Sequence, residues 1–225
     1  MGAGCKVVEW IAGGLEGLAG RGLDERVVRS GTTTVGLIAS DHVILAADKR
    51  ATAGFLIASR RVKKIVMLSN YVAMTVSGLV ADAQILSDVL REEIRLYEMT
   101  NKVKPSVKSV ATLLSNILFS SKFFPYIVQL IVGGYDTQPR LYTLDLFGSI
   151  TEDKYTATGS GSPIAYGVLE ERYREDLSVE EAIKVATTAI RSAVLRDAAS
   201  GDGADVVVIG PQGYEEKFIP YNSLV

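Results

Sequence analysis

The spacing of apolar and polar residues predicts short β-strands in the first part of the chain after residue 31. Up to Val76, apolar and β-branched residues come in short runs interrupted by polar residues and glycines, a pattern typical of strands joined by turns. The predicted strands span residues 32–39, 43–47, 55–59, 62–68 and 71–76. The first two flank a polar break and are expected to pair as a hairpin.

After Gly78 the apolar residues recur at helical spacing, which predicts an amphipathic helix over about residues 81–102. A second helix is expected after Pro105. Further along, Ser162 before Pro163 predicts the N-cap and first position of a third helix. The capping box that begins at Ser178 predicts a fourth.

The order of predicted elements is strands, two helices, two strands, two helices and two strands. The later strand pairs are expected at residues 126–132 with 141–147 and at 205–209 with 216–219. Short turns between paired strands predict antiparallel sheets, and strands that are apolar on both faces need cover on both sides. We therefore predict an α+β fold: a four-layer α-β-β-α sandwich of two antiparallel sheets flanked by helix pairs.

Composition and charge narrow the possible functions. The chain has 225 residues, 48% of them hydrophobic, and a formal net charge of −2 with scattered basic residues. We therefore expect no nucleic-acid partner, and no apolar run approaches the length needed to cross a membrane. Cys5 is the single cysteine, which fits a reducing cytoplasm. With His42 as the single histidine, no metal site is visible and we expect no cofactor.

Residues 1–31 differ in amino-acid composition from the rest and are interpreted as a removable leader. They are rich in glycine and carry a charged cluster at residues 24–26. A secretory signal peptide is the obvious alternative, but Glu9 and Glu16 interrupt the apolar stretch, and no small-residue cleavage pattern follows it. We predict a leader at residues 1–31 and one domain at residues 32–225.

The most informative local sequence is Gly31 followed by three threonines. Threonines are good strand formers, so this run alone favours an ordinary β-strand. If the Gly31–Thr32 bond is cut, however, Thr32 gains a free amine beside its own hydroxyl, which joins nucleophile and general base in one residue. A nearby cation would bring the pKa of that amine, ordinarily about 7.7–8.0, closer to neutrality.

Such a nucleophile needs a cation, an acid that holds the cation, and donors for an oxyanion. Lys64 is a candidate cation, because strand alternation puts it on the same face as Val62 and Val66. Asp48, at the end of the neighbouring predicted strand, is the candidate acid. The competing interpretation is that Lys63 and Lys64 are solvated charges at a strand edge.

Ser160, Asp197 and Ser200 are further candidates. Ser160 is flanked by glycines ahead of a helix, but no Lys-Ser/Thr follows, so a phosphate-binding loop is improbable. It could instead lie close to another backbone segment and shuttle protons to the N-terminal amine. Asp197 and Ser200 follow the last predicted helix, and helix termination alone would also explain them.

With these residues in view, the chain resembles a β-type subunit of the 20S proteasome, closest to the archaeal type. The resemblance covers Thr32 to about Ser223. Each motif is modest alone, but their order and spacing together are highly specific. The motifs are GTTTVG from Gly31, ADKRAT from Ala47, KKI from Lys63, SGLVADAQ from Ser77, LIVGGYD from Leu130, TGSGS from Thr158 and RDAASG from Arg196.

The resemblance implies a threonine endopeptidase. Its leader would be removed autocatalytically between Gly31 and Thr32, exposing Thr32 as nucleophile and, through its free amine, as general base. The remaining catalytic positions correspond to Lys64 and its acidic partner Asp48, to Gly78 with its oxyanion-binding N–H, and to the supporting residues Ser160, Asp197 and Ser200.

The resemblance also implies how substrate binds. An extended peptide would lie between Thr52 and the segment 78–80, pairing through its main chain as an added strand. The pocket for the residue before the cut corresponds to apolar residues of modest size, so we expect cleavage after hydrophobic residues. The substrate-binding positions are Ala51, Thr52, Val62, Val66, Val76 and Val80.

The family's subunits stack as seven-membered rings in a 28-subunit cylinder. We therefore expect α-type subunits and other β subunits as partners, and unfolded proteins supplied by a regulatory ATPase as substrates.

Two alternative functions stay open. The leader of 31 residues is longer than those usual in archaeal relatives, so the chain could be an unprocessed structural or regulatory subunit. An unrelated amidohydrolase with an N-terminal nucleophile would share the fold.

Overall fold

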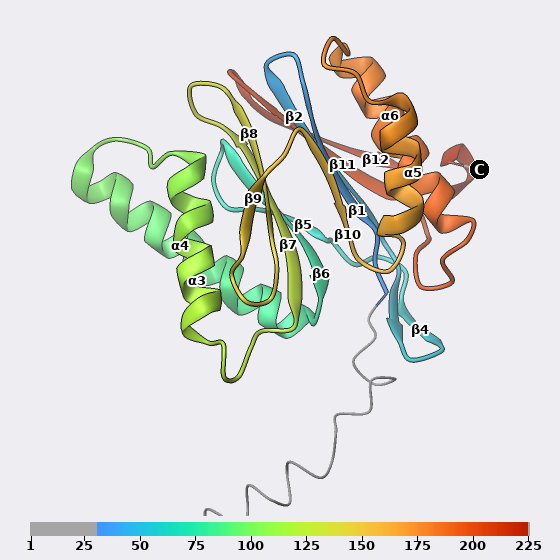
Figure 1. The fold of residues 1–225 in the computed structure, drawn as a ribbon, viewed down its shortest axis with the longest axis horizontal. Coiled ribbons are helices and arrows are strands. Elements are labelled where there is room, and N and C mark those ends of the chain that lie inside the picture. The colour runs from blue at the N-terminus through green and yellow to red at the C-terminus, as the bar shows by residue number, and fades with distance from the viewer. Residues whose placement is uncertain (1–30, 225) are drawn as a thin grey trace, which may run out of the picture.

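The computed structural model describes residues 31–224, and antiparallel sheets form its centre (Figure 1). Apart from Gly31, the predicted leader lies outside the described residues. The strands of the first sheet are β1 (Thr34–Ala39), β2 (His42–Asp48), β10 (Tyr155–Thr158), β11 (Ala204–Gly210) and β12 (Gly213–Ile219). Their order across the sheet is β10-β1-β2-β11-β12.

The second sheet has the strand order of the chain, and a small hairpin stands apart from both sheets. The strands of the second sheet are β5 (Ile65–Met67), β6 (Val72–Gly78), β7 (Val128–Tyr135), β8 (Pro139–Leu144) and β9 (Ile150–Glu152). The separate hairpin consists of β3 (Ala51–Ala53) and β4 (Leu56–Ser59).

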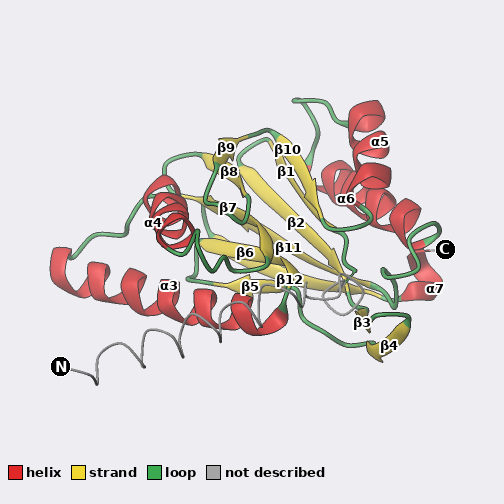
Figure 2. Cartoon of the chain, turned by 60° about the horizontal axis from the view of Figure 1, so that its bottom comes forward, coloured by secondary structure: helices red, strands yellow, loops and turns green. Residues whose placement is uncertain are grey.

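A pair of helices covers the outer face of each sheet, as Figure 2 shows. The helices on the second sheet are α3 (Val80–Asn101) and α4 (Val107–Ser120), those on the first are α5 (Ser162–Arg172) and α6 (Val179–Val194), and a short α7 (Tyr221–Leu224) ends the described chain. Between the sheets, residues such as Leu45 and Ile131 form a third apolar core. The predicted four-layer α+β sandwich is therefore confirmed.

Three short strands were missed by the pattern of apolar residues. Strand β9 is exposed along its whole length, so it has no buried face to produce an alternating pattern. The hairpin strand β3 has only three residues, and β10 has four. Strand β10 matters most, because it pairs with β1 and leads directly into the segment that contains Ser160.

The helix starts were predicted with mixed success. The capping box of α6 is present: the Ser178 hydroxyl accepts from the Glu181 N–H, and the Glu181 carboxylate accepts from the Ser178 N–H. The N-cap of α5 is Gly161 and not Ser162, so that prediction was wrong. The Gly161 carbonyl already accepts the helical bonds from Ile164 and Ala165, which starts the helix one residue earlier.

No helix between residues 31 and 224 has the length and apolar character that crossing a bilayer requires.

Candidate active site

The predicted site residues meet where the ends of several strands converge. In the pairing of β1 with its two neighbours, Thr34 faces both Thr158 of β10 and Ala47 of β2. The segment after β10 and the last residue of β2 therefore lie beside Thr32, which precedes β1. Sequence separation hides this arrangement, since Ser160 is 128 residues away from Thr32 along the chain.

A buried ion pair joins Lys64 and Asp48. The Lys64 Nζ lies 2.7 Å from the Asp48 Oδ1, and the two side chains are 5% and 0% exposed. Backbone N–H groups of Thr33, Arg50 and Gly201 also donate to the Asp48 carboxylate, which fixes its orientation. Burial lowers the pKa of Lys64 below its ordinary value, and the charge of Asp48 opposes that shift. The interpretation of Lys64 as a solvated edge charge is therefore wrong, whereas Lys63 is exposed and pairs with Glu216.

Ser160, Asp197 and Ser200 form a hydrogen-bonded group against the backbone of Thr32. The Thr32 N–H donates to the Ser160 Oγ at 3.2 Å. The hydroxyls of Ser160 and Ser200 donate to the same Asp197 oxygen, at 2.6 and 2.7 Å. Ser200 also exchanges a 2.7 Å hydrogen bond with the Thr33 hydroxyl. Because a hydroxyl has one proton, Ser160 can accept from the Thr32 nitrogen while it donates to Asp197.

Thr32 is 2% exposed and still bonded to Gly31. Its hydroxyl donates to the Gly31 carbonyl oxygen at 2.8 Å, so the hydroxyl lies against the peptide bond that links the two residues. The N–H of Gly31 donates to the Thr52 Oγ1 at 3.2 Å. In this state the Thr32 nitrogen is an amide, which has no basic lone pair to accept a proton.

A cavity of about 620 Å³ opens beside Thr32. Of the predicted substrate-binding positions, all but Thr52 line this cavity. The predicted catalytic residues Thr32, Lys64 and Gly78 line it as well. The predicted positions that line it are Ala51, Val62, Val66, Val76 and Val80. At its edge, Gly78 has φ +116°, and a Cβ there would stand 2.2 Å from the Ile127 carbonyl oxygen, so the position requires glycine.

Comparison with known proteins places the chain in a family. A family model described as "Proteasome subunit" matches residues 28–209. The chain belongs to the proteasome subunit family. It is 97% identical to "Proteasome subunit beta 2" of Aeropyrum pernix over 219 residues, which cover 97% of this chain and 100% of that protein. It is 56% identical to "Proteasome subunit beta 2" of Hyperthermus butylicus, over 83% of this chain and 88% of the relative.

These relatives identify a β-type proteasome subunit of the archaeal kind. "Proteasome subunit beta" of Archaeoglobus profundus is 55% identical over 84% of this chain and 89% of the relative. Proteasome subunits of this family assemble with one another in rings, and β-type members are generally threonine peptidases. The family assignment argues against an unrelated amidohydrolase.

The proteasome fold also brings in residues that the sequence reasoning missed. Polar residues of α3 also line the cavity, and their spacing along one helix face is the signal that could have found them. These residues are Gln84, Ser87, Asp88 and Arg91. The Thr34 hydroxyl bonds that of Thr75 on the second sheet at 2.9 Å and that of Thr158 on the neighbouring strand of its own sheet at 2.7 Å, which ties β1 to β6 and β10 beside the site.

An ion-pair network holds the loop that carries Asp197 and Ser200. The Arg50 guanidinium donates to Asp202 at 2.8 Å and to the Ala198 carbonyl at 2.9 Å, and Arg60 donates to Asp202 at 2.6 Å. Burial alone would raise the pKa of Asp202, but these hydrogen bonds and charges hold it below its ordinary value. The ADKRAT motif contains Arg50, but its sequence pattern does not predict this role.

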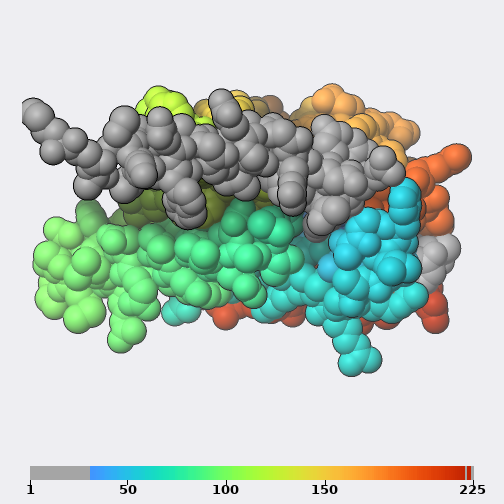
Figure 3. Space-filling model, turned by 90° about the horizontal axis from the view of Figure 1, so that it is seen from below, coloured from blue at the N-terminus to red at the C-terminus, as the bar shows by residue number. Residues whose placement is uncertain are grey.

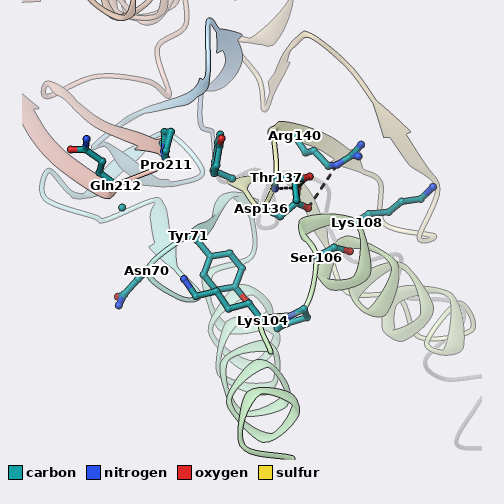
Figure 4. Close-up of a pocket in the computed structure, with 14 residues that line it drawn as sticks. Asn70, Tyr71, Lys104, Ser106, Lys108, Asp136, Thr137, Arg140, Pro211 and Gln212 are labelled. Atoms are coloured by element: carbon teal, nitrogen blue, oxygen red, sulfur yellow. Dashed lines mark hydrogen bonds and ion pairs between the residues drawn. The ribbon is translucent and has the colours of Figure 1, made fainter. Parts of the chain in front are cut away.

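A second cavity, of about 670 Å³, lies at the ends of β7 and β11 that are remote from Thr32. Figure 4 shows the residues that line it. Residues from turns between strands and from the start of α4 line it, and none of them was predicted to belong to the site. Asp136 is one of the lining residues, and its carboxylate accepts from the Val107 N–H and lies 3.8 Å from the Arg140 Nε. Among residues 31–224, no cluster of His, Cys, Asp and Glu is arranged to hold a metal ion.

Proposed function

We propose that this chain is the catalytic β subunit of a 20S proteasome core, a threonine endopeptidase that uses Thr32 as its nucleophile. The observation that carries the proposal is the hydrogen-bonded path from the Thr32 nitrogen through Ser160 to Asp197, beside the buried Lys64–Asp48 pair. These groups surround a position where cutting one peptide bond would create an amine next to a hydroxyl and a cavity. The family's general activity supports the assignment.

In the processed chain, the Thr32 nitrogen would be a free amine. An unperturbed α-amine has a pKa of about 7.7–8.0, and a neighbouring cation lowers it toward neutrality. Lys64 supplies that cation, because Asp48 holds its ammonium group at the wall of the cavity that Thr32 shares. The amine accepts the proton of the Thr32 hydroxyl, and Ser160 exchanges protons with the amine.

Peptide hydrolysis then proceeds in two steps. The Thr32 oxygen bonds to the substrate carbonyl carbon, and the negative charge that forms on the carbonyl oxygen is stabilised by the Gly78 N–H. The carbon–nitrogen bond breaks as the leaving amine takes the proton held by the Thr32 amine, which leaves an ester. Water attacks that ester and regenerates the hydroxyl, releasing a carboxylate.

Leader removal is the same acyl transfer applied to the chain itself, but without a free amine to act as base. The Thr32 hydroxyl attacks the carbonyl carbon of Gly31 and forms a tetrahedral intermediate, in which the Thr32 nitrogen is no longer an amide. That nitrogen takes the hydroxyl proton as the carbon–nitrogen bond breaks, and the peptide bond becomes an ester. Water hydrolyses the ester, which releases the leader with a Gly31 carboxylate and leaves a free amine on Thr32. We infer from this a leader at residues 1–31 and one domain at residues 32–225.

Specificity is proposed to follow from the cavity. Its apolar wall of alanine and valine side chains, including Ala51, Val62 and Val76, favours hydrophobic residues before the cut. The main chain near Thr52 and along residues 78–80 pairs with an extended substrate, which makes binding broadly tolerant of sequence. Unfolded proteins can supply such extended segments.

The proposed partners are α-type subunits and other β subunits, stacked as seven-membered rings in a 28-subunit cytoplasmic cylinder supplied by a regulatory ATPase. Exposed apolar side chains on α3 and on the β3–β4 hairpin support an assembled state. Figure 3 shows both elements at the surface of one face of the molecule. They include Leu96 and Met99 on α3, and Phe55 and Leu56 on the hairpin.

The experiment that tests the proposal is the intact mass of the chain after co-expression with an α-type subunit, together with hydrolysis of a fluorogenic peptide that has a hydrophobic residue before the cut. We expect a mass that begins at Thr32 and measurable hydrolysis. A full-length mass in inactive particles would contradict the proposal and favour an unprocessed structural subunit.

A further inference from the structure

Gly31 is enclosed by the protein on the side where any other residue would carry a side chain. A Cβ at this position would stand 1.7 Å from the Ala199 Cβ, 3.0 Å from the Ala199 Cα and 3.2 Å from the Ser160 Oγ. The first distance is far below any contact that carbon atoms tolerate. Because the obstacle includes main-chain Cα as well as a methyl group, no change of rotamer relieves it.

The N–H of Gly31 is fixed by a different element. It donates to the Thr52 Oγ1 at 3.2 Å, and Thr52 lies on the β3 strand of the separate hairpin. Ala199 lies on the loop between α6 and β11, next to Asp197 and Ser200. Gly31 is therefore held between two segments of the chain, and its carbonyl oxygen stays 2.8 Å from the Thr32 hydroxyl.

A side chain at position 31 would point in a different direction from the side chain of a bound substrate residue. Ala199 does not line the cavity that is proposed to take the hydrophobic side chain of a substrate. The last leader residue therefore presents its Cα toward the loop, whereas a substrate residue would place its side chain in the cavity. The contact with Ala199 is thus specific to leader removal.

We propose that Thr52 and Ala199 form a glycine seat that positions the Gly31 carbonyl against the Thr32 hydroxyl during leader removal. The Ala199 methyl restricts position 31 to glycine, and the Thr52 hydroxyl fixes the rotation of the Gly31 peptide through its N–H. Both residues act as positioning residues for self-processing. The inference rests on the proposed function, because it assigns roles in the cleavage proposed above.

A double-mutant cycle tests the contact between positions 31 and 199. Gly31→Ala, Ala199→Gly and the double variant are each co-expressed with an α-type subunit, and leader loss is followed in time by intact mass. We expect Gly31→Ala to slow leader loss by about 100-fold in the wild-type background, as a displacement near 1 Å does in other active sites. In the Ala199→Gly background the same substitution should cost about tenfold less, a coupling typical of residues in contact.

The cycle distinguishes the seat from the proposed function. If the wild-type chain loses its leader and Gly31→Ala costs the same in both backgrounds, the Ala199 contact is overturned while the protease assignment stands. If the wild-type chain keeps its leader in assembled particles, the proposed function fails, and the seat fails with it.

A matched pair of variants tests the Thr52 hydroxyl. Thr52→Val keeps the branched shape and removes the hydroxyl, and Thr52→Ser keeps the hydroxyl. We expect Thr52→Val to slow leader loss by about tenfold, the value of one hydrogen bond to a neutral group, and Thr52→Ser to restore most of that rate. Co-purification with the α-type subunit shows that each variant is folded. Equal rates for the Val and Ser variants would overturn the role of the hydroxyl.

Discussion

At the scale of single residues, the proposed mechanism depends on Thr32 and its contacts with Gly31 and Ser160. Its hydroxyl contacts the Gly31 carbonyl, and its nitrogen contacts Ser160, so the nucleophile already touches the bond it is proposed to cut. What the unprocessed residue lacks is a base, because an amide nitrogen does not accept a proton. Cleavage would supply that base at the same nitrogen.

Thr32→Ala is expected to abolish leader removal and to reduce peptide hydrolysis by on the order of 10⁵–10⁶-fold, because no other group replaces a catalytic nucleophile. Thr32→Ser keeps a hydroxyl at the same position and is the matched control, which we expect to retain both reactions at measurable rates. Intact mass and a fluorogenic peptide assay measure the two reactions. Substantial activity in Thr32→Ala would refute the assigned nucleophile.

Lys64→Met removes the buried charge and keeps a side chain of similar length. We expect peptide hydrolysis to fall by about 10²–10⁴-fold, since the pKa of the Thr32 amine loses the cation that lowers it. We expect the free energy of unfolding to fall by about 3 kcal/mol, because Asp48 keeps its charge in a buried site without its cation.

Lys63→Met is the matched control for Lys64→Met. Lys63 is the adjacent residue, exposed and paired with Glu216 at the surface, so its loss should change the free energy of unfolding by less than about 1 kcal/mol. Urea denaturation of both variants gives the comparison. A fully active Lys64→Met enzyme would reduce Lys64 to a structural role.

At the scale of elements, α6 links stability to the site. It begins at the capping box of Ser178 and Glu181, and it ends just before the loop that carries Asp197 and Ser200. The backbone N–H and the hydroxyl of Ser178 donate to the Glu181 carboxylate and hold its pKa below the ordinary value of 4.5. A carboxyl whose pKa is lowered in the folded state stabilises the protein above its ordinary pKa, and the contribution disappears as pH falls through the folded value.

Ser178→Ala is expected to lower the free energy of unfolding by about 1 kcal/mol, the usual effect of losing an N-cap. That corresponds to a fall of about 2–4 °C in the melting temperature at neutral pH. Glu181→Gln retains a side chain that can accept from the N-cap and should lose less. The difference between wild type and Ser178→Ala should shrink in acid, where Glu181 is protonated. A difference that is constant with pH would contradict a stabilising role for the ionised Glu181 carboxylate.

Strand pairing explains why some elements were predicted and others were not. The long apolar or periodic runs that became β1, β2, α3 and α6 carry their own signal, because the two strands bury both faces and the two helices bury one face against a large core. Strand β10 has only four residues, and its identity depends on β1, with which it pairs from Leu37 to Thr34. A short segment of this kind gains its hydrogen bonds only after the partner strand is in place.

At the scale of the whole molecule, the exposed apolar residues of α3 need a partner. Leu96 and Met99 are 58% and 62% exposed on a helix whose buried apolar residues, from Ala83 to Ile94, pack in the core of the second sheet. A subunit of a family that assembles in rings is expected to bury such residues against its neighbours.

Leu96→Glu is therefore expected to weaken assembly with the α-type subunit without unfolding the chain, because it places a charge where a neighbouring subunit would exclude water. Glu92→Gln, on an exposed turn of the same helix, is the control and should assemble normally. Native mass spectrometry of co-expressed particles measures assembly, and the melting temperature of the isolated chain checks the fold. Unchanged assembly of Leu96→Glu would show that this face of α3 is not an interface.

The sequence by itself determined the layers of the fold and the chemical types of the proposed site. Periodicity of apolar residues decides which face of each strand and helix is buried, so it predicted two sheets with a helix pair on each. The Gly31–Thr32 step and the resemblance of its surrounding motifs predicted a nucleophile, with Lys64, Asp48 and Ser160 among its partners. These inferences depend on local pattern, which a sequence displays directly.

Only the tertiary structure decided which of these groups touch. Burial of Lys64 depends on both sheets and on Asp48, so strand alternation alone left it undecided between interior and edge. The contact of Ser160 with Thr32, the hold of Arg50 on the 197–203 loop and the closure of Ala199 over Gly31 each join distant parts of the chain. Such contacts are set by strand register and packing, which local sequence does not encode.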